Sequence, residues 1–527
     1  MAARKHSVKD DDDARAAGKG KAAAAAKSKI SAESPALSHL EIRAIVIGIM
    51  LAMFLGALDQ TIVVTALPTI GLAFGEVENL SWVVTAYLLT ATAVTPLYGK
   101  LSDIYGRRRV LLAGIVIFIA GSAACALAPS MTALIFFRAL QGIGGGGLMS
   151  LAQIILGDIV SPRERGRYQG YIGAVFATAS IGGPLLGGVL AQHLHWSLIF
   201  WINLPLGLAA LAMTHRTLIR LPRHERPHKL DVLGAILMMA AAIALMLALT
   251  WGGTRYPWIS APIGALLLGS ALLWGLFSWR LMSAREPFLP VAILKNPIVR
   301  AGTLSGACTM GTMVGLTIFV PLYFEVVAHL SASQSGLALI PLMSSVVLAS
   351  TLTGRAMVYM ERYKRMPLVG LSLSIFSLGA LAIWPSGLPL SLVIALLAAA
   401  GFGIGTVYPV STVSVQNAVS RAQLGTVTGT MNFFRLLGSA LVVALLGAIV
   451  LGGIGGGAGI SLEVLAKSAA NVDLANVFRF VFLAATLVLG FALAFLIAME
   501  ERVLRGPVTA KQTTPTPASP IPPVAAE

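Results

Sequence analysis

Long apolar runs recur along the chain from residue 45 to residue 499, separated by short polar segments. A run of about 20 apolar residues can cross a bilayer as an α-helix, and a chain inside hydrocarbon must satisfy its own backbone groups. These runs lack the alternation of apolar and polar residues that a membrane β-barrel needs. The pattern therefore predicts an all-α polytopic membrane protein. Fourteen spans are predicted, at residues 45–68, 81–99, 110–128, 132–157, 168–191, 198–214, 231–251, 259–279, 301–327, 336–357, 366–384, 389–410, 425–451 and 476–499.

Two low-complexity tails flank the apolar runs. Residues 1–43 combine an acidic run at 10–13 with many Lys and Ala residues, and residues 501–527 are rich in Pro and Thr. Segments of this composition cannot bury enough apolar surface to fold. We expect both tails to be disordered, with a short amphipathic helix on the membrane surface as an alternative for the first. The Gly-rich stretch at 452–459 is predicted to be a loop.

Composition and charge support the membrane class. Hydrophobic residues make up 57% of the chain and charged residues 11%, whereas a soluble domain carries about 25% charged residues. The net charge of +16 would suit nucleic-acid binding, but 33 of the 38 Lys and Arg residues lie in the tails and in alternate loops. This distribution follows the positive-inside rule and predicts that both termini are cytoplasmic. We expect a multi-pass protein of the plasma (inner) membrane with no nucleic-acid partner.

Residues typical of metal centres and enzymes do not form recognisable groups in the sequence. The two cysteines, Cys125 and Cys308, lie in separate apolar runs and suggest neither a disulfide framework nor a metal site. There is no nucleotide-binding P-loop and no nucleophile constellation. We therefore expect neither an enzyme nor a bound cofactor, and a sensor or an integral membrane enzyme is a disfavoured alternative.

Asp59 carries the most informative charge in the predicted spans. It follows the uncharged stretch 44–58, and a charge inside hydrocarbon costs at least about 2.5–3.5 kcal/mol, so it usually faces a cavity, a partner or a proton path. The alternative is a polar residue at a helix end. Most of the 22 acidic residues lie in the tails or loops, and Asp103, Asp158 and Asp231 lie at helix ends, which leaves Asp59 and Glu325 as the candidates within the predicted spans. A proton-driven carrier needs a carboxyl that changes its protonation state, so Asp59 is the first candidate. Glu325 is the second, unless it lies in water at the end of its span.

The loop after the second span reads GKLSDIYGRRR at residues 99–109. Its two glycines permit close backbone contact, and its aspartate can meet a basic side chain or a helix N-terminus. The loop resembles the signature loop of the major facilitator superfamily, except that Ile104 replaces a basic residue. The resemblance implies that the loop stabilises one gate state by pairing with the other half of the protein. The implied gating residues are Gly99, Asp103, Gly106, Arg107 and Arg108.

Two further elements strengthen the resemblance. The fourth span contains Arg138 in the sequence RALQG, similar to an R-x-x-Q-G element of the family. The resemblance implies a role in proton transfer for this arginine, and a structural tie is the alternative. The fifth span contains GPLLGG at 183–188, similar to an element of the antiporting branches, which favours export over uptake. Its helix-packing residues are Gly183, Pro184, Gly187 and Gly188.

Other stretches resemble the fourteen-helix drug:proton antiporter branch of that superfamily. Around Asp59, residues 58–68 read LDQTIVVTALP, and residues 196–207 match a later element with Ser197 in place of the usual arginine. The second half matches at 319–341, where Glu325 replaces a glutamine, and at 426–438. The polar residues of this last stretch are Asn432 and Arg435. The loop at 354–365 is similar to a degenerate copy of the signature loop, which is consistent with two related halves.

The resemblance implies the major facilitator fold, in which two six-helix bundles are joined here by two extra central helices. The predicted division is an N-terminal tail at 1–43, a first bundle at 44–214, a basic loop and two extra helices at 215–297, a second bundle at 298–500 and a C-terminal tail at 501–527.

The implied function is secondary active export of amphipathic compounds in exchange for protons, by alternating access. Protonated Asp59 would release substrate outward and deprotonated Asp59 would accept it inward, with Arg138 tuning the proton affinity of Asp59. The implied partners are a small amphipathic substrate, protons and the lipid bilayer. The chain would act as a monomer with the proton gradient as its energy source. The sequence does not indicate whether it has a periplasmic efflux partner. The alternative is a facilitator without proton coupling, or an exporter of one metabolite or lipid.

Overall fold

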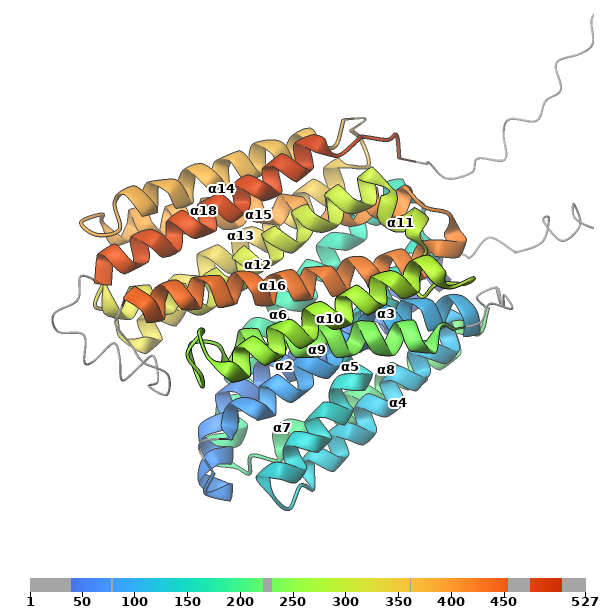
Figure 1. Ribbon diagram of the computed structural model, residues 1–527, viewed down its shortest axis with the longest axis horizontal. Helices are drawn as coiled ribbons and strands as arrows, with labels where there is room; N and C mark the ends of the chain where they lie inside the picture. Colours follow the sequence, from blue (N-terminus) through green and yellow to red (C-terminus); the bar gives the residue numbers. More distant parts are fainter. Residues whose placement is uncertain (1–38, 77–78, 221–229, 361, 454–473, 505–527) are drawn as a thin grey trace, which may run out of the picture.

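The computed structural model describes residues 39–76, 79–220, 230–360, 362–453 and 474–504 (Figure 1). Within these ranges, fourteen helices are long and apolar enough to span a membrane, as predicted. The helices of the first half are α2 (His39–Phe74), α3 (Leu80–Tyr105), α4 (Arg107–Ala126), α5 (Met131–Ile159), α6 (Pro162–His193), α7 (Leu198–Trp201) and α8 (Asn203–Thr217). The central pair is α9 (Val232–Trp251) and α10 (Ala261–Ser283). The second half contains α11 (Val291–Lys295), α12 (Pro297–Val326), α13 (Ala332–Ala356), α14 (Arg365–Ile383), α15 (Leu390–Asn417), α16 (Leu424–Gly453) and α18 (Leu474–Ala498).

Helix α2 is longer than predicted at both ends. It begins at His39, inside the predicted tail, and passes through Pro68 to Phe74. Glu41 in its first turn lies favourably at the positive end of the helix dipole. Proline is tolerated inside membrane helices because neighbouring groups can satisfy the freed carbonyl. The predicted disorder of residues 1–38 and of 505–527, and most of the predicted loop at 452–459, lie outside the described residues.

Several helix starts follow directly from capping residues. Ser130 accepts a hydrogen bond from the backbone of Ala133 at the start of α5, and Ser331 forms a capping box with Gln334 at the start of α13. Asn296 caps α12, with a proline at the first helical position. Each cap satisfies backbone N–H groups that have no partner within the helix.

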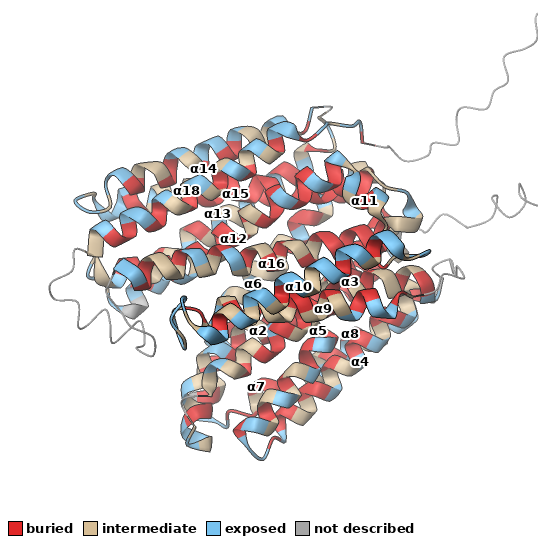
Figure 2. Cartoon of the chain, in the orientation of Figure 1, coloured by how far each residue is buried: buried red, intermediate tan, exposed pale blue. Residues whose placement is uncertain are grey.

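Burial follows the helix faces that point into the bundle, whereas many outward faces are apolar and exposed (Figure 2). Large exposed side chains include Leu72, Phe136, Leu268 and Phe376. Exposed leucine and phenylalanine suit a lipid environment, because lipid tails are as apolar as these side chains. Separate apolar cores form within each half, one of them around Phe118 in the first half.

The two halves meet at the end of the bundle where α3 ends and α4 begins. We call it the basic end, because Lys100 and the arginines at 107–109 lie there. A Cβ atom at Gly99 of α3 would collide with the carbonyl of Gly425 on α16, and Gly166 on α6 contacts Gly354 on α13 equally closely. Glycine at these positions lets the backbones approach. From this end the two groups of helices diverge toward the other end (Figure 1).

The central pair α9 and α10 packs against both halves. Its apolar side chains share one core with residues of α3 and α16. At the basic end, Asp231 caps α9 and pairs with Arg280 of α10, with Nε 3.1 Å from the carboxylate. Trp274 of α10 lies against Phe433 of α16, with ring centroids 6.3 Å apart. The pair therefore bridges the two halves along one side of the bundle.

Candidate functional site

Asp59 lies on α2 and is fully buried within the first half. Its Oδ2 accepts a hydrogen bond of 2.7 Å from Nη1 of Arg138 on α5. Its Oδ1 accepts bonds from the side-chain amides of Gln141 at 2.8 Å and Asn203 at 2.9 Å. The carboxylate thus has three donors from two other helices, which offsets the cost of burying its charge.

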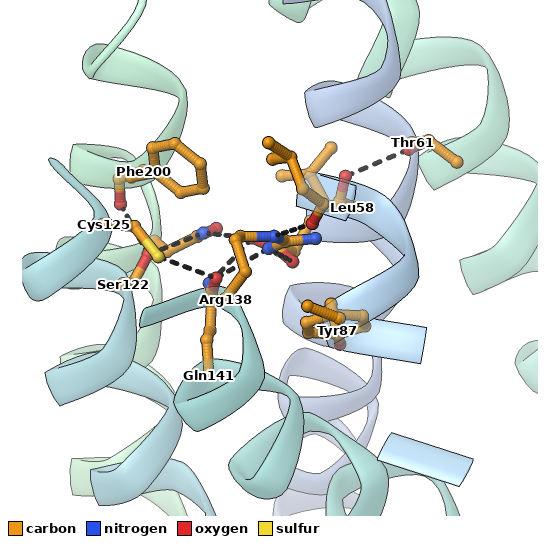
Figure 3. Close-up of polar contacts among 12 residues, drawn as sticks. Leu58, Thr61, Tyr87, Ser122, Cys125, Arg138, Gln141 and Phe200 are labelled. Carbon is orange, nitrogen blue, oxygen red and sulfur yellow. Dashed lines mark hydrogen bonds and ion pairs between the residues drawn. The ribbon is translucent and has the colours of Figure 1, made fainter. Parts of the chain in front are cut away.

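Arg138 is equally buried and is surrounded by acceptors and rings (Figure 3). Its Nε donates to the carbonyl of Val83 at 3.0 Å, and its Nη1 donates to both Asp59 and Gln141. The guanidinium lies over the ring of Tyr87, 4.4 Å from the centroid. A planar guanidinium stacks well on an aromatic face, so ring contact and ion pair stabilise the same charge.

The sequence around Arg138 explains why these groups meet. Arg138 and Gln141 are three residues apart, so both side chains lie on one face of α5. The glycine run that follows lets α5 approach its neighbours: a Cβ at Gly142 would collide with Tyr87 and Thr90 of α3. Gly144 contacts the backbone of α4 in the same way. The run is therefore a packing surface that brings α3 and α4 against the buried pair.

Sequence reasoning missed the polar residues that complete this cluster. Asn203 also donates to Ser122 Oγ at 3.0 Å, and Ser122 donates to the carbonyl of Phe200 at 2.9 Å. Cys125 Sγ lies 3.7 Å from the Gln141 carbonyl oxygen. Gln141 and Asn203 both fall inside recognised stretches, but no spacing rule indicated that they face Asp59. We call Asp59, Arg138, Gln141, Asn203 and Ser122 the acid cluster.

The signature loop connects the two halves at the basic end. Asp103 accepts hydrogen bonds from the backbone of Thr426 at 2.8 Å, from its hydroxyl at 2.7 Å, and from the backbone of Gly425 at 3.2 Å. These donors form the first turn of α16, where free N–H groups favour an anion. Arg107 pairs with Asp103 at 2.5 Å and with Asp158 at 2.8 Å. Gly106 adopts a φ of +89°, which a glycine tolerates. Arg108 lies 3.3 Å from His215, within the first half.

The glycine motif of α6 faces α2 only in part. A Cβ at Gly183 would collide with Thr61, and one at Gly187 would collide with Thr65 and Ile62. Thr61 Oγ1 donates to a carbonyl of α6, that of Ala179, at 2.8 Å. Gly188 instead faces open space, and Pro184 lies inside the helix. The segment of α2 that follows Asp59 is therefore held against α6.

The second-half candidates lie apart from the acid cluster. Glu325 is exposed in the last turn of α12 and accepts a hydrogen bond of 3.1 Å from Ser335. Asn432 on α16 donates to Gln153 on α5 at 3.0 Å, so it contacts the other half. Arg435 is buried on α16, and no described residue forms with it the kind of ion pair that Arg138 has. Within the described residues, no group of three His, Cys, Asp or Glu side chains could hold a metal ion.

Comparison with known proteins gives consistent matches. A family model described as Major Facilitator Superfamily matches residues 49–443. The chain is 38% identical over 423 residues to an uncharacterized MFS-type transporter of Mycobacterium tuberculosis, covering 80% of this chain and 61% of that protein. The chain therefore spans about three-fifths of that relative's length. It is 37% identical over 410 residues to Multidrug transporter protein MdtP of Bacillus subtilis, covering 77% of this chain and 75% of that protein.

Among solved structures, the human organic anion transporter MFSD10 matches with a TM-score of 0.60 and 18% identity, covering 85% of this chain and 99% of that chain. At this identity the likeness concerns the fold alone. Together with the fourteen spans, it confirms the predicted fold class.

Proposed function

The chain belongs to the major facilitator superfamily, whose members are transporters rather than enzymes, and we propose that it exports amphipathic compounds in exchange for protons. The relatives named as multidrug transporters support an amphipathic cargo. The observation that carries proton coupling is the buried pair of Asp59 and Arg138. The substrate class and the coupling are both open to direct test.

Asp59 is the group suited to bind the exchanged proton. Arginine cannot lose its proton in a protein, so Asp59 is the member of the pair that can change charge. The only other acidic side chain that the described residues bury this deeply is Asp231, which caps α9 beside Arg280. Protonation of Asp59 removes the partner of Arg138 and one acceptor of the amides. The acid cluster must then rearrange, and α2 with it.

This rearrangement offers a route to alternating access. Helix α2 is held against α6, and α6 meets α13 of the other half at the basic end. A shift of α2 therefore reaches a contact between the halves. We place the basic end in the cytoplasm, following the distribution of Lys and Arg, with both termini there and the chain in the plasma (inner) membrane as a monomer. The described conformation then has its cytoplasmic end closed by Asp103 and α16.

In the proposed cycle, deprotonated Asp59 holds Arg138 while the cytoplasmic end opens and cargo enters. The halves then close at that end, and a proton from outside neutralises Asp59 as cargo leaves. The proton is released inward when the halves return. The proton gradient supplies the energy for this cycle, and the cycle uses no cofactor.

One observation favours a second candidate function. Asp59 and Arg138 already form a complete ion pair, with amide donors on the remaining oxygen. A pair that never opens would act as a structural tie, and the protein would then be a facilitator without proton coupling.

Transport by the purified protein in proteoliposomes with an imposed pH gradient separates the two candidates. We expect Asp59→Asn to lose proton-driven accumulation of a fluorescent cargo while retaining exchange of cargo down its own gradient. Retained exchange demonstrates folding. The matched control is Glu500→Gln, which removes an exposed carboxylate paired with Arg502. Full proton-driven accumulation by Asp59→Asn would overturn the assignment of Asp59. Unchanged accumulation by the parent protein after collapse of the gradient would overturn proton coupling itself.

A further inference from the structure

Arg435 is the second buried arginine inside a predicted span, after Arg138, and the acid cluster does not involve it. It is 7% exposed, on α16. Its Nη2 donates to the hydroxyls of Ser411 at 2.6 Å and Thr412 at 3.1 Å, both on α15. Its Nε is buried and has no acceptor among the residues that the structure describes. Nη1 likewise donates to no group in the described ranges.

No anion in the described chain balances this charge. The described residues place no carboxylate within ion-pair distance of Arg435, and Tyr408 is the ionisable side chain beside it. Arginine keeps its charge in proteins, and neutral hydroxyls compensate a buried charge poorly. Two hydroxyls occupy one nitrogen and leave the donors of Nε and Nη1 unused. Arg435 is therefore a buried charge with unused hydrogen-bond donors.

The position of Arg435 suits contact with cargo. Asn432 lies one turn before it on α16 and touches Gln153 of the other half. Residue numbers on α16 increase away from the basic end, so Arg435 lies beyond this contact, on the side where the halves diverge. Gly306 on α12 lets the guanidinium pack directly against that helix, since a Cβ there would lie 2.7 Å from Nε and collide with it. Tyr408 and Met310, whose hydroxyl and sulfur lie 3.7 Å apart, supply apolar surface nearby.

We propose that Arg435 binds an anionic group of the transported molecule, a carboxylate or a group of similar charge and shape. The unused N–H donors would make charge-assisted hydrogen bonds to it, which are the strong kind. The inference rests on the proposed export function and specifies its cargo: an amphipathic molecule with an apolar body and one negative charge. Asp59 on α2 would then handle the proton, and Arg435 on α16 the cargo.

The test is a binding measurement with no gradient present. The purified full chain in lipid nanodiscs is titrated with a dansylated amino acid, which bears one carboxylate, and separately with its methyl ester, which is neutral. We expect the parent protein to bind the acid more tightly than the ester. We expect Arg435→Gln to weaken binding of the acid by about tenfold or more and to leave the affinity for the ester unchanged. The matched control is Arg255→Gln, which removes an exposed arginine outside the membrane spans and should alter neither probe.

Two further variants sharpen the interpretation. Arg435→Lys keeps the charge but not the forked pair of donors. Its affinity for the acid should therefore lie between the affinities of the parent protein and of Arg435→Gln. Gly306→Ala places a methyl group against Nε and should weaken binding of the acid but not of the ester. Unchanged ester binding in each variant demonstrates that the protein is folded.

Three outcomes would overturn the inference. In the first, Arg435→Gln weakens binding of the acid and of the ester equally. In the second, it changes neither affinity. The preference for the acid could also vanish when chloride is added at constant ionic strength with gluconate as the reference anion, because Arg435 would then hold an inorganic anion. Proton-driven export of neutral compounds in any of these cases would leave the proposed function intact. Failure to export any cargo, with the acid still bound through Arg435, would instead overturn the proposed function alone.

Discussion

Arg138 in the first half and Arg435 in the second half are both buried well inside a membrane helix, and the two halves surround these charges in different ways. Arg138 has a carboxylate at 2.7 Å and an aromatic ring beneath it, whereas Arg435 has two hydroxyls and unused donors. Arg138 lies seven residues from the end of α5 opposite the basic end, about 10 Å along the helix, and Arg435 eleven residues from the basic end of α16, about 17 Å. Arg138 is therefore neutralised by a carboxylate of the protein, whereas Arg435 keeps donors for the proposed anionic group of the cargo.

The largest expected effect tests this difference as a difference in stability. Arg138→Gln leaves Asp59 buried without a counter-charge, and breaking a buried pair costs about 3–5 kcal/mol. Arg435→Gln removes a charge that no described carboxylate accompanies, and the freed hydroxyls can bond to carbonyls of their own helix, so we expect a change within about 1 kcal/mol. Denaturant unfolding of both variants in the same detergent measures the two changes.

The double variant Asp59→Asn with Arg138→Gln serves as the internal control. It removes both charges, so it should recover most of the stability that Arg138→Gln loses. If Arg435→Gln proves as destabilising as Arg138→Gln, the two arginines are equivalent structural ties and the comparison fails.

The first-half arginine site could be predicted from the sequence only in part. The number of spans and the presence of Asp59 and Arg138 inside them could be predicted, because hydropathy and the cost of a buried charge are local properties. That Arg138 acts on Asp59 was expected only from the family resemblance, because their contact depends on how α2 and α5 are rotated toward each other. Asn203 was missed for the same reason, because it reaches Asp59 from α8, 144 residues further along the chain.

Helix ends set a second limit on prediction. Glu325 could be assigned either to the interior of a span or to its wet end, and the structure places it exposed in the last turn of α12. A shift of one turn decides between these environments, and hydropathy does not locate a boundary that closely. The lack of a described carboxylate near Arg435 also could not be predicted from the sequence, because it depends on how α12, α15 and α16 pack together.

A smaller effect is expected where α6 packs against α2 beside the acid cluster. In Gly183→Ala the added methyl group collides with Thr61, so the helices must separate or bend, at a cost of about 1–3 kcal/mol. Gly188→Ala meets nothing within 4 Å and should change stability by less than about 0.5 kcal/mol. Thermal unfolding of the two variants provides the measurement. Equal destabilisation would mean that the motif acts through backbone flexibility rather than through contact with α2.

The smallest expected effect concerns the contact that joins the two halves. In Asp103→Asn the anion at the first turn of α16 is lost, and with it the ion pair to Arg107. Interactions of this kind are worth about 1–2 kcal/mol, so the closed basic end should lose roughly 5- to 30-fold in population relative to the open one. Spin labels at Tyr105 and Tyr359, both exposed and in different halves, report the separation by pulsed electron resonance. Both positions are changed to cysteine in a background with Cys308→Ser, and the buried Cys125 is left in place.

The expected result of that measurement is a longer distance between the labels in Asp103→Asn than in the parent protein. Arg300→Gln is the matched control, because it removes an exposed charge at the basic end of α12. An unchanged distance would mean that Gly99 and Gly425, through backbone contact alone, keep the end closed. The comparison between the halves would then extend to their junction: charge would govern the two buried arginine sites, and close glycine packing would govern the contact between them.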